Sequence, residues 1–396
     1  MIIKPRIKGF LCTTAHPLGC ARDVAEQIAY VKDRGPLENG PSRVLVIGAS
    51  GGYGLASRIS AAFGSRAATL GVFFERPAQG KRTASPGWYK SAAFTERALS
   101  DNLYATNING DAYSDEIKNQ TIETIKRDLG EIDMVVYSLA APHRTLANGT
   151  VFRSVLKPIG KSFSGVTIDI NTSQIRPVTL EPATEKEITD TIKVMGGEDW
   201  ELWIKALMEA KVLSRGCITT NYTYLGSEVT WPIYNQGTIG KAKEDLDRAA
   251  SFLCGKLSIL GGTAKVAVMK GLLTSASSAI PGMALYLSLL FKVMKREGNH
   301  EDCIEQTTRL FSSELFGKGD AVTDEAGRIR MDRWELAENI QAYIKSNWSK
   351  VNHSNLNDLA DFAEYQNAFL RLHGFGFSGI DYAEDVSPFV EMELVE

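Results

Sequence analysis

The sequence has few of the residues that cross-link a chain or bind a metal. It contains five cysteines, an odd number, with no C-x-x-C pair among them. The five histidines likewise show no spacing typical of metal ligands. These scarcities argue against a disulfide framework and a zinc site, and they predict free thiols in a reducing compartment and no metal. The cysteines are Cys12, Cys20, Cys217, Cys254 and Cys303.

The sequence also lacks an excess of charge of one sign. Its 44 Lys and Arg balance 47 Asp and Glu, so no basic field for nucleic acid or an anionic membrane is expected. The first residues, MIIKPRIKGF, have no apolar h-region, which argues against a secretory signal. The one long apolar run, residues 276–294, is interrupted by serines, Pro281 and Gly282, and predicts a buried helix starting near Pro281 instead of a membrane span. We therefore expect a cytoplasmic protein.

Short apolar runs alternate with amphipathic segments in the first part of the chain. RVLVI (43–47) is typical of a strand buried on both faces, and apolar residues then recur at every fourth position of 55–63 before Gly64. Ser114 is placed to cap a helix that Gly130 ends. This alternation predicts an α/β fold with a Rossmann-type, doubly wound parallel sheet. The predicted strands are residues 43–47, 69–75, 103–109, 133–140, 217–226 and 264–274.

The pattern changes after residue 142. Residues 143–183 are rich in Lys, Gly, Ser, Thr and Pro, with short alternating runs such as GVTIDI, and they predict a hairpin-like insertion. A helical pattern returns at 198–210, and the chain is mostly helical from 281 onward, with a turn-rich segment near 374–382. We expect one elaborated Rossmann domain over residues 1–396. Its parts would be a first half (1–142), the insertion (143–200) and a second half with extra C-terminal helices (201–396).

Glycines fill the turn between the first strand and its helix. Gly48, Gly52 and Gly54 form a G-x-x-x-G-x-G arrangement directly after strand 43–47 and before helix 55–63. The first glycine allows a tight turn, the second lets the backbone approach a pyrophosphate, and the third lets helix and strand pack closely. The helix N-terminus adds free N–H groups and the positive end of a dipole. Because the strand and the helix stand on the correct sides, the segment predicts a dinucleotide-binding turn.

Acidic residues follow the next two strands. Glu75 ends the second strand, where a carboxylate accepts hydrogen bonds from ribose hydroxyls and repels a 2′-phosphate, which favours NAD(H) over NADP(H). Arg76, directly after Glu75, could instead favour NADP(H) by pairing with the 2′-phosphate. The third interpretation is that Glu75 and Arg76 form an exposed ion pair with no role in binding. Asp111, just past the third strand, is placed to meet the adenine or its ribose, or is an ordinary turn aspartate.

A tyrosine precedes two lysines in WPIYNQGTIGKAKEDL (231–246). In short-chain dehydrogenases/reductases a tyrosine donates a hydrogen bond to the substrate oxygen, and a lysine four residues later holds the nicotinamide ribose. Here the fourth position after Tyr234 is Thr238, and NYTYLG offers Tyr224 where that superfamily carries a serine. Both departures argue against reduction of a simple ketone or aldehyde.

Spacing alone does not choose between the two lysines. In an unbroken helix, Lys241 lies seven residues after Tyr234 on nearly the same face, whereas Lys243 lies on the opposite face. Gly237 and Gly240 make an unbroken helix doubtful. Thr238 would then cap a helix that starts after the tyrosine, and Lys243 becomes admissible as well.

The chain closely resembles the FabV-type trans-2-enoyl-ACP/CoA reductases from end to end. In that family the tyrosine and the lysine are spaced Y-x8-K, which maps onto Tyr234 and Lys243 and makes Lys241 a neighbouring cation. The matching stretches are AHPLGC (15–20), GASGGYG (48–54), GVFFERP (71–77), INGDAYSDEIK (108–118), VYSLAAP (136–142), KVMGGEDW (193–200), YNQGTIGKAK (234–243) and LYLSLLFKVMK (285–295).

The resemblance implies a reaction. It implies that a monomer uses NADH to reduce the conjugated double bond of a trans-2-enoyl thioester, carried on ACP or CoA, in bacterial fatty-acid elongation. Hydride would reach the β-carbon, and Tyr234 would stabilise the enolate charge on the thioester oxygen. Lys243 would position the ribose, and Tyr224 would support Tyr234 or share the contact with substrate.

The resemblance also implies which residues line the site. Those expected at the active centre are Tyr53, Asp111, Tyr224, Tyr234 and Lys243. Those expected to contact the cofactor are Gly48, Ala49, Ser50, Gly51, Gly52, Tyr53, Phe74, Glu75, Asp111, Ala112, Leu139, Ala140, Lys243, Leu272, Leu273 and Thr274.

Two other functions stay open at this point. One is carbonyl reduction, which the missing Y-x-x-x-K pattern and the missing serine disfavour. The other is NAD sensing without turnover, which the retained Tyr and Lys disfavour, since a sensor needs neither. The apolar helix near 281–294 follows the strand that should end at the nicotinamide, and it either forms a wall of the acyl-chain pocket or only packs in the core.

Overall fold

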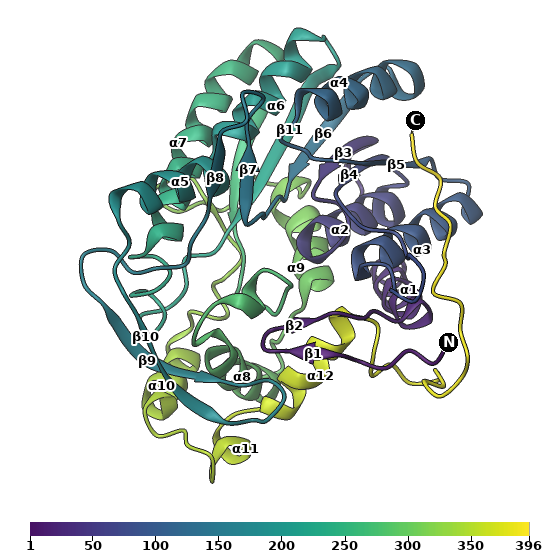
Figure 1. Ribbon diagram of the computed structural model, residues 1–396. Coiled ribbons are helices and arrows are strands. Elements are labelled where there is room, and N and C mark those ends of the chain that lie inside the picture. Colours follow the sequence, from purple (N-terminus) through teal and green to yellow (C-terminus); the bar gives the residue numbers. More distant parts are fainter. Residues whose placement is uncertain (396) are drawn as a thin grey trace.

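Seven parallel strands form the central sheet of the molecule (Figure 1). The computed structural model describes residues 1–395. The strand order is β13-β12-β11-β6-β3-β4-β5, so the chain enters at β3, winds to one edge and returns through β6 to the other. Every neighbouring pair is parallel, which confirms the predicted doubly wound, Rossmann-type α/β fold. The strands are β3 (Arg43–Ile47), β4 (Ala68–Phe73), β5 (Ala105–Asn109), β6 (Ile132–Tyr137), β11 (Leu213–Thr223), β12 (Thr263–Val268) and β13 (Ile329–Arg330).

Helices cover both faces of this sheet and form a further layer beside it (Figure 1). The α-helices are α1 (Pro17–Asp33), α2 (Gly52–Ile59), α3 (Pro86–Ser100), α4 (Asp115–Thr124), α5 (Glu185–Met195), α6 (Glu198–Glu209), α7 (Thr238–Leu257), α8 (Met283–Arg296), α9 (Cys303–Arg309), α10 (Glu338–Trp348), α11 (Leu356–Leu359) and α12 (Phe362–Leu372). Short π- or 3-10 segments are η1 (Ser60–Gly64), η2 (Ile125–Leu129), η3 (Ser258–Leu260), η4 (Ser277–Ala279) and η5 (Leu310–Leu315).

The central strands are buried on both faces, as RVLVI predicts. In β3, Leu45 and Ile47 belong to an apolar cluster closed by α4, α6 and α7. Val44 and Val46 belong to a second cluster on the other face, closed by η1 and η5. Successive side chains of a strand point to opposite faces, so a strand between two helical layers needs an apolar residue at every position.

A separate apolar cluster surrounds α8. Nearly all of this helix is buried, and α10 and α12 pack against it. In Figure 1 these helices lie below the sheet, with the β9–β10 hairpin (Phe163–Ile168 and Ile175–Leu180) beside them. The run near 281–294 is therefore a buried helix, as predicted. No helix within residues 1–395 is long and apolar enough to cross a membrane.

The insertion after β6 is built of hairpins, as its composition predicts. The first joins β7 (His143–Thr145) to β8 (Val151–Arg153), and the second joins β9 to β10. A third hairpin near the N-terminus joins β1 (Ile7–Lys8) to β2 (Leu11–Cys12). The Asn171 side-chain amide donates to the Ile7 carbonyl at 3.2 Å, so the N-terminal hairpin and the β9–β10 hairpin are tied together over the α8 cluster.

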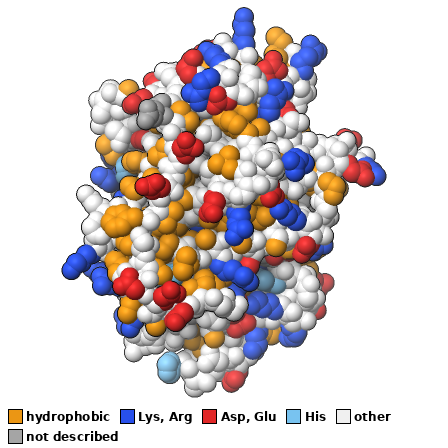
Figure 2. Space-filling model, turned by 90° about the vertical axis from the view of Figure 1, so that its right-hand side faces the viewer, with side chains coloured by type: hydrophobic (Ala, Val, Ile, Leu, Met, Phe, Trp, Pro, Cys, Tyr) orange, Lys and Arg blue, Asp and Glu red, His pale blue; other side chains and the backbone are white. Residues whose placement is uncertain are grey.

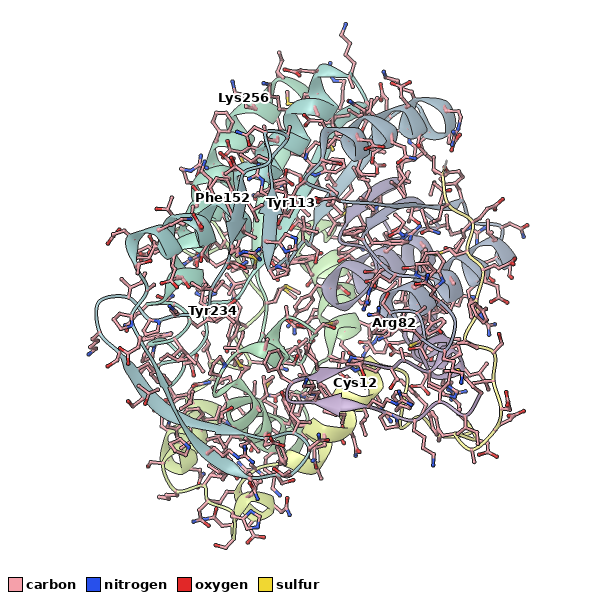
Figure 3. All side chains as sticks on the ribbon, viewed as in Figure 1. Cys12, Arg82, Tyr113, Phe152, Tyr234 and Lys256 are labelled. Atoms are coloured by element: carbon pink, nitrogen blue, oxygen red, sulfur yellow. The ribbon has the colours of Figure 1, made fainter. Side chains whose placement is uncertain are left out.

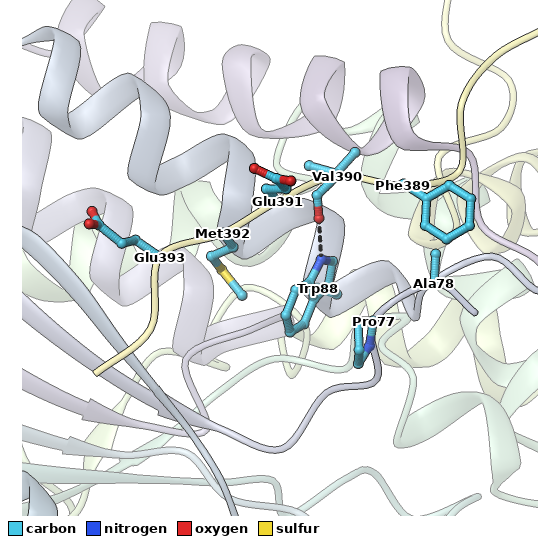
Figure 4. A pocket seen from close by; sticks show the side chains of 8 residues that line it. All are labelled: Pro77, Ala78, Trp88, Phe389, Val390, Glu391, Met392 and Glu393. Atoms are coloured by element: carbon cyan, nitrogen blue, oxygen red, sulfur yellow. Dashed lines mark hydrogen bonds between the residues drawn. The ribbon is translucent and has the colours of Figure 1, made fainter. Parts of the chain in front are cut away.

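The last described residues run back along the first half of the fold. The Trp88 indole donates to the Val390 carbonyl at 2.9 Å, beside a hollow of about 660 Å³ (Figure 4). The Val395 amide donates to the Asn107 carbonyl of β5 at 2.9 Å, which shields this edge strand from pairing with another chain. Figure 2 shows apolar side chains over the middle of the face that carries α1, α3 and this tail, with charges of both signs interspersed.

Three helices were not predicted from the sequence. In α3, residues 87–95 are all buried, so this stretch has no solvent-facing side. Its sequence therefore lacks the regular alternation of apolar and polar positions that predicts an amphipathic helix. α1 is capped by His16, which is outside the usual set of capping residues. α5 carries a capping box formed by Thr184 and Glu187, so in this case the sequence does contain a helix signal. The predicted helix from Ser114 to Gly130 is confirmed, since the Ser114 hydroxyl accepts the Ile117 amide at 3.2 Å.

Candidate active site

The candidate site lies where the parallel strands end. Four of the predicted strands are too long at their carboxyl ends. The observed strands β4, β6, β11 and β12 end at residues 73, 137, 223 and 268. The residues beyond those ends are loops at the carboxyl edge of the sheet, where ligands bind in open α/β folds. Some predicted site residues belong to the glycine turn or to α7. Most of the others lie in these loops.

Main-chain contacts fix the glycine turn after β3. Gly48 has φ +85°, and a Cβ added there would lie 2.1 Å from the Ser138 carbonyl oxygen. A Cβ at Gly54 would lie 2.0 Å from the Gly48 carbonyl oxygen. Gly51 is the N-cap of α2 and offers no side-chain cap, so the first-turn N–H groups remain available for an anion. The turn therefore fits the pyrophosphate of a dinucleotide.

Glu75 is held at the rim of this turn. The Ser50 hydroxyl donates to its carboxylate at 2.7 Å. Asn109 clamps the Glu75 backbone, accepting from its amide at 2.8 Å and donating to its carbonyl at 3.0 Å. Phe74 beside it is 77% exposed, an apolar surface next to the carboxylate, and Arg76 is exposed. Glu75, not Arg76, is the residue that contacts the glycine turn.

The other predicted cofactor residues surround the same edge. Asp111 accepts the Tyr113 amide at 3.0 Å in the turn that leads to α4. Ala112 is buried, and its carbonyl accepts from the Trp203 indole at 3.0 Å, so that carbonyl is not available to a ligand. Leu139 is partly buried and Ala140 is exposed after β6.

The loop after β12 approaches the glycine turn from the other side. Leu272 and Leu273 are buried although they lie outside any strand. A Cβ added at Gly52 would lie 3.6 Å from the Thr274 methyl group, so the two loops are in contact. The Tyr53 hydroxyl donates to the Lys270 carbonyl at 3.0 Å, and its proton is therefore used to bind this loop to α2.

The backbone around Tyr234 is set by the glycines that follow it. Its carbonyl accepts the amides of both Gly237 and Gly240 at 3.0 Å. A Cβ added at Gly240 would lie 1.7 Å from the Asn235 carbonyl oxygen, so no other residue fits there. α7 begins after the tyrosine, as predicted, but its N-cap is Gly237 and not Thr238, whose hydroxyl instead donates to the Val155 carbonyl of the insertion.

The Tyr234 side chain is buried but its hydroxyl has no partner. Tyr234 is 8% exposed, and Figure 3 places it between the β7–β8 hairpin, marked by Phe152, and the β9–β10 hairpin. Its ring meets the Tyr224 ring edge to face, with centroids 5.0 Å apart. Burial raises the pKa of the Tyr234 hydroxyl, and no hydrogen bond within residues 1–395 opposes that rise. At neutral pH this group is a free O–H donor.

The two lysines have different surroundings. Lys243 is half-buried and its ammonium donates to the Tyr222 carbonyl, near the end of β11, at 3.2 Å. Burial lowers the pKa of Lys243 to about 8, against the opposing charge of Asp247. Lys241 is exposed and pairs with Glu244 at 2.8 Å on the outer face of α7. Only Lys243 lies against the carboxyl edge of the sheet.

Tyr224 has a partner that the sequence did not reveal. Its hydroxyl donates to Glu335 at 2.9 Å, and the same carboxylate accepts from Tyr286 and from the Gly271 amide. Burial, and then the Glu335 charge, raise the pKa of Tyr224. Glu335 lies in RWELAEN, a stretch with no motif, so no sequence signal identified it.

Comparisons with known proteins agree with this geometry. A family model described as "Trans-2-enoyl-CoA reductase catalytic region" matches residues 82–316, and one described as "NAD(P)H binding domain of trans-2-enoyl-CoA reductase" matches residues 2–80. The chain belongs to the trans-2-enoyl-CoA reductase family. The resemblance stated from the sequence motifs is thus confirmed.

Relatives match the chain over its whole length. The enoyl-[acyl-carrier-protein] reductases [NADH] of Aliivibrio salmonicida and Serratia proteamaculans are each 55% identical, over 100% of both chains. The trans-2-enoyl-CoA reductase of Clostridium acetobutulicum, solved with NADH, has a TM-score of 0.96 at 41% identity and 98% coverage of both chains. That of Treponema denticola, solved with NAD, has a TM-score of 0.95 at 47% identity and 100% coverage.

A third family model, described as "Enoyl reductase FAD binding domain", matches residues 323–386. This segment contains α10, α11 and α12 but no glycine-rich turn between a strand and a helix within its described residues. Its large apolar side chains pack against α8. The segment does not fit a flavin dinucleotide, whereas the turn after β3 fits a nicotinamide dinucleotide.

The position of Glu75 predicts the effect of removing its charge. Glu75→Gln keeps an oxygen for the Ser50 hydroxyl but removes the repulsion of a 2′-phosphate, so the preference in kcat/KM for NADH over NADPH should fall about tenfold, or about 1.4 kcal/mol. Steady-state assays with both cofactors measure this ratio. Glu96→Gln, at an exposed position of α3, is the matched control, and an unchanged ratio in Glu75→Gln would contradict the assignment.

The surroundings of the two lysines predict their effects on cofactor affinity. Lys243→Ala should raise the Kd for NADH about tenfold or more, whereas Lys241→Ala should leave it within about twofold, since an exposed ion pair contributes little. The wild-type Kd should also rise as the pH passes about 8, where the Lys243 ammonium loses its charge, and that rise should be absent in Lys243→Ala. Fluorescence titration of NADH measures both effects, and the reverse ranking of the lysines would restore Lys241.

Proposed function

We propose that this protein uses NADH to reduce the carbon–carbon double bond of trans-2-enoyl thioesters carried on ACP or CoA. End-to-end similarity to enoyl-ACP reductases [NADH] supports this reaction. The observation that carries it is the largely buried side chain of Tyr234, which lies beside Tyr224 and whose hydroxyl has no protein hydrogen bond within residues 1–395, at the edge of the sheet that carries the glycine turn. A phenolic donor that no protein group occupies is what a developing enolate requires.

The chemistry divides between cofactor and chain. Bound NADH supplies the hydride for the β-carbon of the enoyl group. As that bond forms, negative charge develops on the thioester oxygen, and the Tyr234 O–H donates a hydrogen bond to it. A proton that is then added to the α-carbon converts the enolate to the saturated thioester and completes the reduction. Because burial keeps this phenol protonated at neutral pH, it acts as a donor throughout, in a low-dielectric setting where such a bond is strongest.

Of Tyr53, Tyr222, Tyr224 and Tyr234, only Tyr234 has a hydroxyl with no protein hydrogen bond within residues 1–395. The Tyr53 and Tyr224 hydroxyls donate to the Lys270 carbonyl and to Glu335, and the Tyr222 hydroxyl is bonded to Ser57 at 2.6 Å. Tyr224 therefore supports Tyr234 through its ring, and it offers substrate an acceptor oxygen but no proton. This agrees with the expectation that Tyr224 supports Tyr234 or shares the contact with substrate, and it limits that contact to accepting a hydrogen bond.

Lys243 is assigned to the nicotinamide ribose. It lies nine residues after Tyr234 on α7, and its ammonium reaches the Tyr222 carbonyl near the end of β11. Lys241, paired with Glu244 in solvent, has no such access.

The α8 cluster is assigned to the acyl chain. Leu287 of α8 approaches Gly271 closely, since a Cβ at Gly271 would lie 3.4 Å from the leucine side chain. The apolar helix therefore begins directly behind the loop that contacts the glycine turn.

We place the reaction in fatty-acid elongation and the protein in the cytoplasm as a monomer, in keeping with its free thiols and with the family resemblance.

Removing the Tyr234 hydroxyl tests its role. Tyr234→Phe keeps the ring that packs on Tyr224 but removes the donor, so kcat should fall about 10²-fold or more while the Kd for NADH stays unchanged. Stopped-flow absorbance of NADH gives the first quantity and fluorescence titration the second. Tyr104→Phe is the control. Tyr104 lies just before β5, at the opposite edge of the sheet, and its hydroxyl donates to Asp128. Near-normal turnover in Tyr234→Phe would remove this residue from the central role.

Substrate choice tests the reaction itself. NADH absorbance should fall with crotonyl-CoA and stay constant with acetoacetyl-CoA, because the proposed hydride transfer needs a carbon–carbon double bond conjugated to the thioester, which acetoacetyl-CoA lacks. The opposite pattern would indicate a carbonyl reductase, and no turnover with any enoyl thioester would indicate a protein that only binds the dinucleotide. Matched crotonyl-ACP and crotonyl-CoA assays then rank the two carriers by kcat/KM.

A further inference from the structure

Glu335 is a fully buried carboxylate in the turn between β13 and α10. It forms no ion pair within residues 1–395; the buried Lys270 ammonium acts on it only through space. It is satisfied by hydrogen bonds instead, with Tyr224 and Tyr286 donating to Oε1 and the Gly271 amide donating to Oε2. Burying a carboxylate without a cation beside it is costly, and three donors are what offsets that cost.

The three donors come from three parts of the site. Tyr224 follows β11, Gly271 follows β12, and Tyr286 belongs to α8. Packing is tight where they meet, since a Cβ at Gly271 would lie 3.1 Å from the Tyr224 hydroxyl and 3.2 Å from Glu335 Oε1. An ionised carboxylate is an acceptor with no donor of its own, so it suits a point where three donors converge better than an amide does.

Two consequences follow for the site. The hydrogen bond from Tyr224 fixes the ring against which Tyr234 packs edge to face at 5.0 Å. The hydrogen bond from the Gly271 amide fixes the start of the loop whose Thr274 methyl group contacts the glycine turn at Gly52. One side chain is thus connected to the donor tyrosine on one side and to the cofactor turn on the other.

We propose that Glu335 is a positioning residue that sets the Tyr224–Tyr234 pair for the enolate and the Gly271–Thr274 loop for NADH. This inference rests on the proposed function for the first of these roles only. Glu335 touches neither substrate nor reacting atoms, and it acts through two separate hydrogen-bonded branches. The branches predict two separable effects: turnover depends on the tyrosine branch, and cofactor affinity depends on the Gly271 branch.

A double-mutant cycle separates the branches. Glu335→Ala should lower kcat for crotonyl-CoA about tenfold and raise the Kd for NADH about tenfold, the scale of losing hydrogen bonds to a charged group. In a Tyr224→Phe background the Glu335→Ala effect on kcat should shrink to about twofold, because the bond is already absent, while its effect on NADH affinity should stay the same. Equal effects on kcat in both backgrounds would overturn the tyrosine branch. An unchanged NADH affinity would overturn the Gly271 branch.

Glu335→Gln provides the conservative comparison and serves if the alanine variant fails to fold. The oxygen of the glutamine side chain still accepts from the Gly271 N–H, so NADH affinity should stay within about twofold. Its NH₂ group faces the two tyrosine hydroxyls, which must then accept hydrogen bonds instead of donating them, so kcat should fall by about threefold. That loss of kcat should vanish in the Tyr224→Phe background, and its persistence there would overturn the proposal. Glu338→Gln, at an exposed position in the first turn of α10, is the matched control and should change neither quantity.

The assays also separate this inference from the proposed function. NADH affinity is measured by fluorescence without turnover, so the Gly271 branch is tested whatever the substrate. If the wild-type protein binds NADH but reduces no enoyl thioester, the proposed function fails and the Gly271 branch is still decided. If the wild type reduces crotonyl-CoA and the cycle is additive, only the tyrosine branch of the inference fails.

Discussion

Close approach of backbone to backbone at the carboxyl edge of the sheet is the constraint on which the site depends. Three glycines there leave no room for a side chain: added Cβ atoms at Gly48, Gly54 and Gly240 would lie 2.1, 2.0 and 1.7 Å from carbonyl oxygens. The first two set the cofactor turn and the third sets the turn that carries Tyr234. Main-chain contacts therefore fix the backbone of both turns, the one that carries Tyr234 and the one proposed for the dinucleotide.

Hydrogen bonding distinguishes Tyr234 from its neighbouring tyrosines, and this difference is the basis of the proposal that Tyr234 acts on the substrate. Tyr53, Tyr222, Tyr224 and Tyr234 crowd one edge, and burial raises the pKa of each, so all are protonated donors at neutral pH. Protein groups bond to the hydroxyls of the first three, whereas no protein hydrogen bond to the Tyr234 hydroxyl is present within residues 1–395. The Tyr234 hydroxyl is therefore the one of the four that can donate to a ligand without first breaking a protein hydrogen bond.

The local parts of this design could be predicted from the sequence. The RVLVI strand, the glycine turn and the cap at Ser114 are local patterns, and each was found where expected. The choice of Lys243 over Lys241 could not be derived from spacing, because it depends on where α7 begins, and that start is set by contacts between Gly237 and the insertion. Glu335 lies 111 positions from Tyr224, and no local pattern carries a contact of that kind.

The errors in strand length are themselves informative. The predicted strands ending at 75, 140, 226 and 274 overrun the observed ends, whereas those ending at 47 and 109 stop correctly. An apolar run continues past the last ladder hydrogen bond when the chain leaves the sheet but stays buried under something else. Here Leu272 and Leu273 are buried beneath the α8 cluster and the glycine turn. In the loop after β12, apolar sequence without strand pairing is thus explained by burial outside the sheet. Each of the four overruns contains residues that the family resemblance places at the cofactor or the substrate.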